Sequence, residues 1–413
     1  MILKKVFMLL VLLLVICLLS VVAWSKEIVI GFTGPLSGPA AEYGFDCIKG
    51  INIGIKKVNE SGGIKIKGET YTLRLEKLDD QIDPTRAVIN ARRLKEQHGA
   101  VAVFEPVGGL AHAIMGINQE KMHEFLVMAY TSTPSTAKMG NKLTIILPPP
   151  LSIYAQVFAK WCEDKAYQRA GILLNNDSYG TDWKTYFTKY FRGTIASVQS
   201  ANYYKEIDYT AQISAILATK PDVMLIGGPS PTTALVIEQA RSMGYKGAFV
   251  LIDQAKLDYV KHILKGTVLL ENVIAVAMVD SLPSPVTPWV KRTLQENYKG
   301  LYNWEISIHF GAVLALARAI AAAGTPSDVW AIRKSFPRAY PIGVNEAPSP
   351  VFGLSPEGIQ LMPASVQSVK DGKISKPRLP IWWVKNKKEF DNVVKALHLD
   401  PKMADCEFMP LEF

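Results

Sequence analysis

The chain has 413 residues, of which 49% are hydrophobic and 20% are charged, and its formal net charge is +9 at pH 7. This length is enough for two lobes with separate cores, and the sequence contains no low-complexity tract or short repeat. A basic chain can bind nucleic acid, anionic lipid or an acidic partner, but lysines that are spread over many helices are typical of a solvated surface.

The first residues have the pattern of a secretion signal. Two lysines precede an apolar run over residues 6–22, and a small-x-small cleavage site follows at residues 23–25. We therefore expect residues 1–25 to be a signal peptide and the mature protein to begin near Lys26. The alternative is a retained membrane helix, because seventeen apolar residues are at the lower limit for spanning a bilayer. Secretion places the protein in the periplasm or on the extracellular face, and it excludes nucleic acid as a partner.

The next predicted unit is a strand, a glycine-rich loop and an amphipathic helix. Residues 28–30 form an apolar strand, and residues 31–39 form a loop that carries glycines and hydroxyl side chains. Apolar residues then recur at intervals of three and four, as on the buried face of a helix, until Gly62 and Gly63 end it. The alternation continues with strands at 71–75, 100–104 and 125–129 and with helices from Asp83 and over 110–120. This order predicts a parallel sheet with helices on both faces.

A second array of strands and helices follows a break at residues 148–150, three prolines that no helix or central strand tolerates. Strands are predicted at 171–174, near 195, at 223–226, 249–252 and 273–278, and helices over 181–191, 209–218, through Arg241, and over 290–298 and 308–323. The helix over 308–323 is apolar enough to be buried against the first array. Residues 353–362 then lead back to a strand at 365–369.

The order of these segments predicts two lobes. Residues 26–147 and 279–360 are expected to form the first lobe. Residues 148–278 and 361–413 are expected to form the second lobe, which includes a C-terminal extension. The chain would pass between the lobes three times, so that three strands make the hinge.

Several catalytic and cofactor chemistries are excluded by missing motifs. The glycines after the first strand lack the G-x-G-x-x-G spacing, and no phosphate-binding P-loop is present. No G-x-S-x-G, H-E-x-x-H or C-x-x-C motif occurs, and the six histidines are scattered. Cys47, Cys162 and Cys406 stand in unrelated contexts, so we expect no disulfide. We therefore expect no catalytic residue, no metal site and no cofactor.

Three short sequence motifs occur in an order and at a spacing that resemble those of a known family. They are SGPAAEYG at residues 37–44, NESGGI at 59–64 and DDQIDP at 79–84. Together they resemble the type I periplasmic binding proteins, and in particular the leucine/isoleucine/valine-binding branch, from about Lys26 to about Lys373. The resemblance implies two Rossmann-like lobes with parallel sheets flanked by helices and joined by a three-strand hinge. It also implies a monomer that closes over a small solute and delivers it to the membrane permease of an ABC transporter.

The resemblance also implies how a solute would be held. The family holds an amino acid's carboxylate with amides and hydroxyls of the first lobe and its ammonium with an acid of the second lobe. Thr131, Ser132 and Thr133 match the first role, and Asp253 falls at the acid. Gly108 stands where the family often has a serine, so only its backbone N–H could contribute. For Asp253, the alternative is a cap of the helix predicted over 256–264.

Three further residues are candidates. Tyr43 and Tyr179 match aromatic positions of the family and could contact an apolar side chain, although ordinary packing is the alternative. Glu105 is an acid in a loop at the end of a strand, where it could bind a second donor group of the solute. It could equally be a charge on the rim or the partner of a lysine.

We expect the solute to be a branched-chain or related amino acid. Aromatic or organic acids, and amides or urea, are the alternatives within the same class of protein. A soluble ligand-sensing partner of a membrane receptor is the alternative outside that class, because such a protein would have the same sequence features.

Overall fold

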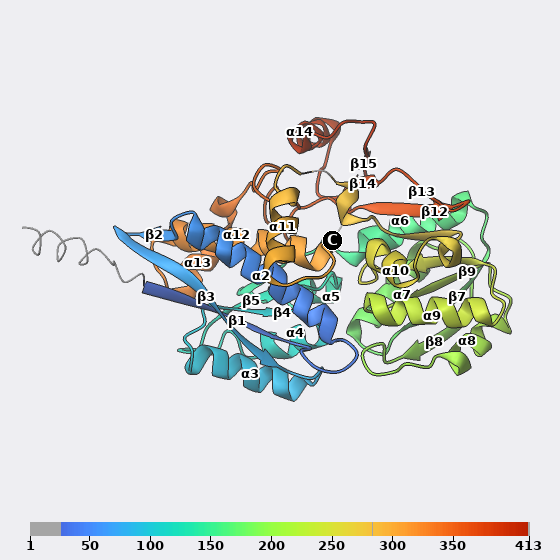
Figure 1. The fold of residues 1–413 in the computed structure, drawn as a ribbon, viewed down its shortest axis with the longest axis horizontal. Coiled ribbons are helices and arrows are strands. Elements are labelled where there is room, and N and C mark those ends of the chain that lie inside the picture. Colours follow the sequence, from blue (N-terminus) through green and yellow to red (C-terminus); the bar gives the residue numbers. More distant parts are fainter. Residues whose placement is uncertain (1–25, 283, 412–413) are drawn as a thin grey trace, which may run out of the picture.

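The computed structural model describes residues 26–282 and 284–411 (Figure 1). The predicted signal peptide, residues 1–25, lies outside the described residues. Two separate sheets organise the described chain. We call the part built on the first sheet the first lobe and the part built on the second sheet the second lobe; the residue boundaries predicted for the lobes stay a prediction.

The first lobe is built on a six-stranded sheet in the order β2-β3-β1-β4-β5-β6. Neighbouring strands are parallel except β2 and β3, which form an antiparallel hairpin. The strands are β1 (Lys26–Gly34), β2 (Ile64–Ile66), β3 (Glu69–Asp79), β4 (Ala102–Glu105), β5 (Leu126–Ala129) and β6 (Thr144–Ile146). The helices between them are α2 (Ala41–Glu60), α3 (Pro84–Glu96), α4 (Gly108–Met115) and α5 (Pro134–Lys138). Asp83 caps α3 by accepting a hydrogen bond from the backbone N–H of Arg86, as the sequence predicted.

The second lobe is built on a nine-stranded sheet in the order β15-β14-β12-β11-β10-β9-β7-β8, with β13 paired to β12. Strands β7 to β11 are parallel, whereas β12 runs antiparallel to both β11 and β14. The strands are β7 (Arg169–Asn175), β8 (Thr194–Ala201), β9 (Val223–Gly227), β10 (Ala248–Leu251), β11 (Val273–Val276), β12 (Val366–Lys370), β13 (Lys373–Ile374), β14 (Arg378–Ile381) and β15 (Asp405–Phe408). The helices before β11 are α6 (Leu151–Asp164), α7 (Ser178–Tyr190), α8 (Thr210–Leu217), α9 (Ser230–Ser242) and α10 (Leu257–Ile263). The predicted α/β architecture is thus confirmed.

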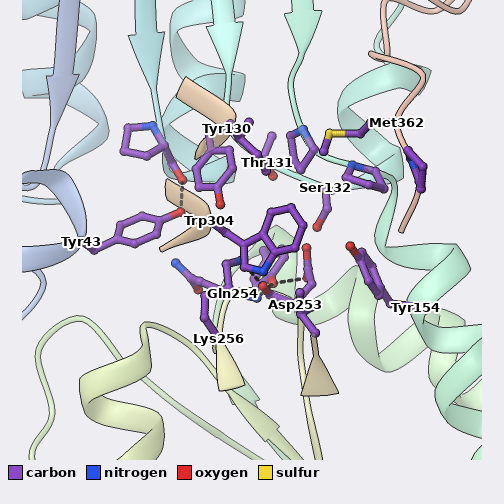
Figure 2. A pocket seen from close by; sticks show the side chains of 18 of the residues that line it. Tyr43, Tyr130, Thr131, Ser132, Tyr154, Asp253, Gln254, Lys256, Trp304 and Met362 are labelled. Atoms are coloured by element: carbon purple, nitrogen blue, oxygen red, sulfur yellow. Dashed lines mark hydrogen bonds between the residues drawn. The ribbon is translucent and has the colours of Figure 1, made fainter. Parts of the chain in front are cut away.

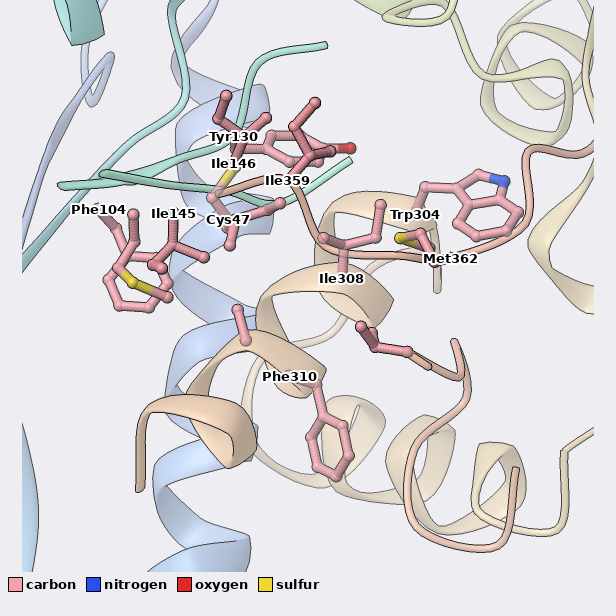
Figure 3. Close-up of a cluster of buried hydrophobic side chains, with 14 of the residues drawn as sticks. Cys47, Phe104, Tyr130, Ile145, Ile146, Trp304, Ile308, Phe310, Ile359 and Met362 are labelled. Carbon is pink, nitrogen blue, oxygen red and sulfur yellow. The ribbon is translucent and has the colours of Figure 1, made fainter. Parts of the chain in front are cut away.

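The long helix α12 (Trp304–Ala323) packs against α2 in the core of the first lobe (Figure 3). A side chain on α2 at Gly50 would lie 2.6 Å from the carbonyl oxygen of Ile306, and one at Gly54 would lie 2.8 Å from Cβ of Val313. These two glycines, one helical turn apart, therefore allow the two helices to approach closely. Among the described helices, α12 is the one long and apolar enough to cross a membrane, and 72% of its most apolar window is buried in the protein.

The connections between the lobes lie side by side. The backbone N–H of Ile146 donates to the carbonyl of Gly358, and the N–H of Ala277 donates to the carbonyl of Ser365. Two further helices, α11 (Thr287–Asn297) and α13 (Val329–Ser335), flank α12 in the sequence. The C-terminal helix α14 (Lys387–Leu397) lies over the junction of the two lobes (Figure 1).

Two predicted helices have different ends in the structure. The helix predicted over 308–323 begins four residues earlier, at Trp304, because Asn303 caps it by accepting a hydrogen bond from the N–H of Ile306. The helix predicted over 110–120 covers Gly108–Met115 and ends before Gly116. Cys47, Cys162 and Cys406 are free thiols in the structure.

Candidate functional site

A cleft lies between the two lobes, at the carboxyl ends of their parallel strands (Figure 2). Both lobes line it: the segments after β4 and β5 from the first, and those after β7, β8 and β10 from the second. Six of the eight predicted site residues line this cleft, namely Tyr43, Gly108, Thr131, Ser132, Tyr179 and Asp253. The carboxyl edge of parallel strands is where open α/β sheets bind ligands.

The first lobe contributes backbone amides and hydroxyls. Gly108 is the first residue of α4, so its N–H has no acceptor within the helix. The hydroxyl of Thr131 shares a hydrogen bond of 2.8 Å with that of Thr133, and a side chain at Gly108 would lie 2.8 Å from the Thr131 oxygen. Ser132 is buried, and its hydroxyl has no hydrogen-bond partner among the described residues. This side of the cleft therefore presents groups that can donate hydrogen bonds to an anion.

The second lobe contributes a carboxylate. Oδ1 of Asp253 accepts hydrogen bonds from the hydroxyl of Tyr179 at 2.5 Å and from Nε1 of Trp183 at 2.9 Å. No side-chain capping hydrogen bond occurs at the start of α10, which begins at Leu257. The capping interpretation of Asp253 is therefore wrong: two buried ring donors fix this carboxylate at the cleft instead.

Aromatic rings form most of the remaining wall. Tyr43 stacks on Tyr130, with ring centroids 6.2 Å apart, and its hydroxyl donates to the carbonyl of Pro106 at 3.1 Å. Tyr154 and Trp304 line the cleft from other directions (Figure 2), and Tyr204 also belongs to its lining. Such a lining suits an apolar or aromatic part of a ligand, because large rings bury much apolar area with little loss of side-chain entropy.

A buried charge pair crosses from one lobe to the other. Lys256 follows β10 of the second lobe, and its Nζ lies 3.7 Å from Oε1 of Glu305, on the first turn of α12. Both side chains are buried, and the hydroxyl of Tyr130 donates to the same carboxylate at 3.3 Å. Burial raises the pKa of Glu305 to about 7, and Lys256 acts in the opposite direction.

His309 lies one turn along α12 from Glu305. Its ring contacts Tyr130 edge to face, with centroids 4.7 Å apart, and its Nδ1 is 2.7 Å from the carbonyl oxygen of Glu305. Burial lowers the pKa of His309 to about 4, so the ring is neutral at pH 7. His309 therefore contributes no positive charge beside Glu305 at pH 7, and Lys256 is the cation that pairs with this carboxylate.

Two predicted site residues do not line the cleft. Glu105 is fully buried, and its Oε1 accepts a hydrogen bond of 2.8 Å from the N–H of Val107. Burial, with a smaller contribution from the nearby carboxylate of Asp80, raises the pKa of Glu105 well above its usual value. Glu105 was predicted to bind a donor group of the solute, with a charge on the rim as an alternative, but it lies neither at the cleft nor at the surface and shapes the turn before α4. Thr133 lies behind Thr131 and supports it through their shared hydrogen bond.

Sequence reasoning missed Lys256, Trp304 and Glu305. Lys256 had been assigned to the start of a helix, and the two residues of α12 precede the predicted start of that helix. Asn303, a good capping residue, was the available signal for a start at Trp304. Nothing in the sequence alone pairs Lys256 with Glu305, because the contact depends on how the lobes face each other. Among the described residues, no group of three or more potential metal ligands is brought together.

The fold and the cleft define a class of protein: two α/β lobes that bind a small molecule between them. A family model for periplasmic binding proteins matches residues 27–373, and the chain therefore belongs to the family of periplasmic binding proteins. The resemblance to type I members of the Leu/Ile/Val-binding branch is thereby confirmed.

Curated relatives have similar names. The chain is 25% identical over 235 residues to a Leu/Ile/Val-binding protein of Citrobacter freundii, covering 56% of this chain and 63% of that protein. It is 26% identical over 233 residues to the Leu/Ile/Val-binding protein BraC3 of Rhizobium johnstonii, covering 54% and 60%. The aligned region thus spans less than two thirds of each of these relatives.

Solved structures have the same fold. A leucine-binding protein of Thermotoga maritima superposes with a TM-score of 0.70 at 20% identity, covering 88% of this chain and 99% of that one. A solute-binding protein from R. palustris in complex with benzoate superposes with a TM-score of 0.71 at 15% identity, covering 85% and 95%. At these identities the similarity shows the fold alone.

Proposed function

We propose that this chain is an extracytoplasmic solute-binding protein that captures a small amino acid with an apolar side chain between its two lobes. The names of its relatives support this proposal. So does the cleft, which has hydrogen-bond donors on the side of the first lobe and the carboxylate of Asp253 on the side of the second lobe. In the proposed mechanism the solute touches both lobes only when they are closed, so binding shifts the population toward the closed form.

The observation that carries the proposal is the uncompensated carboxylate of Asp253. Its Oδ1 is held by Tyr179 and Trp183, and no hydrogen bond among the described residues reaches Oδ2. The ammonium group of the buried Lys256 donates to the backbone carbonyl oxygen of Asp253 and pairs with Glu305, and no hydrogen bond among the described residues joins it to the Asp253 carboxylate. A buried carboxylate without a cation is unfavourable, so an ammonium group on the solute is the expected partner. The solute's carboxylate would then face the start of α4 and the hydroxyls of Thr131 and Ser132.

An aromatic or other organic acid is the second candidate. The rings of Tyr43, Tyr130 and Trp304 that line the cleft would suit such a ligand, and a structural neighbour is described as a complex with benzoate. This candidate needs no ammonium group, so Asp253 would have no role in binding it.

The test compares leucine with 4-methylpentanoate, which differs from leucine only by lacking the amine. Calorimetric titration of the purified protein should show binding of leucine, and Asp253→Asn should weaken it by about 10²- to 10³-fold, because one partner of a buried charge pair is lost. Asp177→Asn is the matched control, because Asp177 caps α7 and does not line the cleft.

Three results would decide between the candidates. Unchanged leucine affinity in Asp253→Asn would contradict the ammonium role of Asp253. Binding of 4-methylpentanoate or benzoate, but not of leucine, would favour the organic-acid candidate. Failure of all these ligands to bind would direct the search to amides and urea.

We propose that the closed protein delivers its solute to the membrane permease of an ABC transporter. The alternative is presentation of the solute to a membrane receptor. Permease and ATPase genes beside this gene would support transport, whereas a receptor or kinase gene would support sensing.

A further inference from the structure

A second cavity lies behind the wall of the candidate site. It is small, with a volume of about 30 Å³, and we call it the side cavity. Trp304, Met362 and Pro363 line both the side cavity and the cleft, so the same side chains separate the two spaces. Figure 3 shows Trp304 and Met362 next to each other at the edge of the buried cluster.

The side cavity has a mainly apolar lining. Apart from the shared residues, it is formed by Leu282, Val344, Pro348, Leu379, Leu397 and a few neighbours. A polar group that entered would lose its hydrogen bonds to water without gaining new ones, whereas a hydrocarbon chain would gain contacts. The chemistry of the lining therefore selects an apolar occupant.

The far wall of the side cavity comes from the C-terminal extension. Leu379 lies on β14 and Leu397 on α14, and both follow residue 373, where the match to the family model ends. We call the side chains of Trp304, Met362 and Pro363, which separate the cleft from the side cavity, the partition. The extension also fixes the partition, because Nε1 of Trp382 donates a hydrogen bond of 2.8 Å to the carbonyl of Met362. This wall is therefore made by a part of the chain that lies outside the family match.

Trp304 and Met362, the two main side chains of the partition, differ in conformational freedom. The indole of Trp304 is fixed by a hydrogen bond of 2.7 Å from Nε1 to the carbonyl of Ala277. The thioether of Met362 is unbranched, with several rotatable bonds, and can change rotamer while its backbone stays in place. Met362 is thus the part of the partition that can move.

We propose that the side cavity receives the end of an unbranched apolar side chain of the solute, which passes Trp304 when the Met362 side chain turns aside. The inference rests on the proposed function for the position of the amino and carboxylate groups. It names the class of solute: amino acids whose side chain is linear and longer than that of leucine.

The test is a series of linear amino acids: L-alanine, L-norvaline, L-norleucine and L-2-aminoheptanoate. Calorimetric titration of the whole mature chain should show affinity that rises about fourfold for each added methylene group, up to the longest member. Leu397→Phe should fill the side cavity and weaken binding of L-2-aminoheptanoate at least tenfold, while the affinity for L-alanine changes less than twofold.

Two further variants keep the test decisive. Val394→Phe introduces the same phenylalanine side chain on α14 at a half-buried position that does not line the side cavity, and it should leave the whole series unchanged. Leu399→Phe, at a half-buried lining position, replaces Leu397→Phe if that variant has a lowered melting temperature. Equal affinities for the longest member in wild type, Leu397→Phe and Leu399→Phe would overturn the proposal, as would wild-type affinity that stops rising at L-norvaline.

A failure of the proposed function would look different. If no amino acid of the series binds, the amino acid assignment is wrong, and the linear acids from propanoate to heptanoate then test the side cavity alone. If affinity for these acids rises with chain length and Leu397→Phe abolishes the rise, the side cavity receives an apolar chain even though the ligand has no amine. If affinity does not change with chain length, the proposal is overturned.

Discussion

The hydroxyl of Thr131 occupies the space beside Gly108 that a side chain at position 108 would need. A Cβ at Gly108 would lie 2.8 Å from Oγ1 of Thr131 and 3.3 Å from Oγ1 of Thr133. The first distance is too short for two non-bonded atoms, so a serine at 108 and a threonine at 131 exclude each other. We infer that Thr131 supplies, from the end of β5, the hydroxyl that Gly108 lacks.

This exclusion predicts a compensating pair of substitutions. Gly108→Ser should destabilise the protein by about 1–3 kcal/mol, because it forces atoms into a filled space, and should also weaken solute binding. Thr131→Ala alone should weaken binding by about 1 kcal/mol through loss of a hydroxyl. The double variant should recover most of both losses, because one hydroxyl replaces the other. Urea unfolding and calorimetric titration of the four proteins give the coupling energy, and strictly additive effects would contradict the inference.

At the residue scale, site residues in the loops at the ends of strands could be located from the sequence. Site residues that depend on contacts between distant segments were missed. The loops after β4, β5 and β10 could be placed from strand patterns, and the family resemblance then pointed to Gly108, Thr131 and Asp253 within them. Lys256 was missed because a lysine before a helix has many ordinary explanations. Its burial beside Glu305 depends on contacts between distant segments.

At the scale of elements, the start of α12 matters most for the cleft. The first turn of this helix carries Trp304 and Glu305, and its position depends on Asn303, whose Oδ1 accepts from the N–H of Ile306. The other end of the same side chain donates a hydrogen bond of 2.6 Å to Asp46 of α2. Asn303 therefore both caps α12 and joins it to its neighbour. The sequence prediction followed the apolar pattern alone and began the helix a turn too late.

The two roles of Asn303 can be separated by substitution. Asn303→Ala should lower the free energy of unfolding by about 2–4 kcal/mol, because it removes a cap worth about 1 kcal/mol and a hydrogen bond to a charged group. Asn303→Ser keeps a capping oxygen but does not reach Asp46, so it should be about 1 kcal/mol more stable than Asn303→Ala. Urea denaturation measures both values. Equal stability of the two variants would show that the cap contributes nothing.

At the scale of the whole molecule, strand and helix alternation predicted two parallel arrays and the order of their elements. It could not predict the partition between the cleft and the side cavity, or the course of the C-terminal extension. Those features depend on pairs such as Trp304 and Leu397, which are far apart in the sequence and line the same cavity only through tertiary packing. Local patterns carry no information about such contacts.

The charge pair between Lys256 and Glu305 joins the two lobes, so it should influence their closure. In an open form both side chains would be hydrated, whereas in the structure both are buried. Burial raises the pKa of Glu305 from the usual 4.5 to about 7. The closed protein therefore keeps a proton on Glu305 at pH values where an exposed carboxyl has released it, so closure becomes less favourable as the pH rises from 4.5 to about 7 and depends little on this group at higher pH. Lys256 reduces this penalty by stabilising the carboxylate.

Three variants follow from this argument. Lys256→Met removes the cation, so the pKa of Glu305 should rise further, and the lobes should stay closed at pH 6 but open at pH 9. Glu305→Gln leaves a buried lysine without its partner and should open the lobes at both pH values, because removing one partner of a buried pair typically costs about 3–5 kcal/mol. The double variant has neither charge and should close at both. The radius of gyration from X-ray scattering at saturating solute measures closure. If the Lys256→Met variant has the same radius of gyration at pH 6 and pH 9, Glu305 does not control closure.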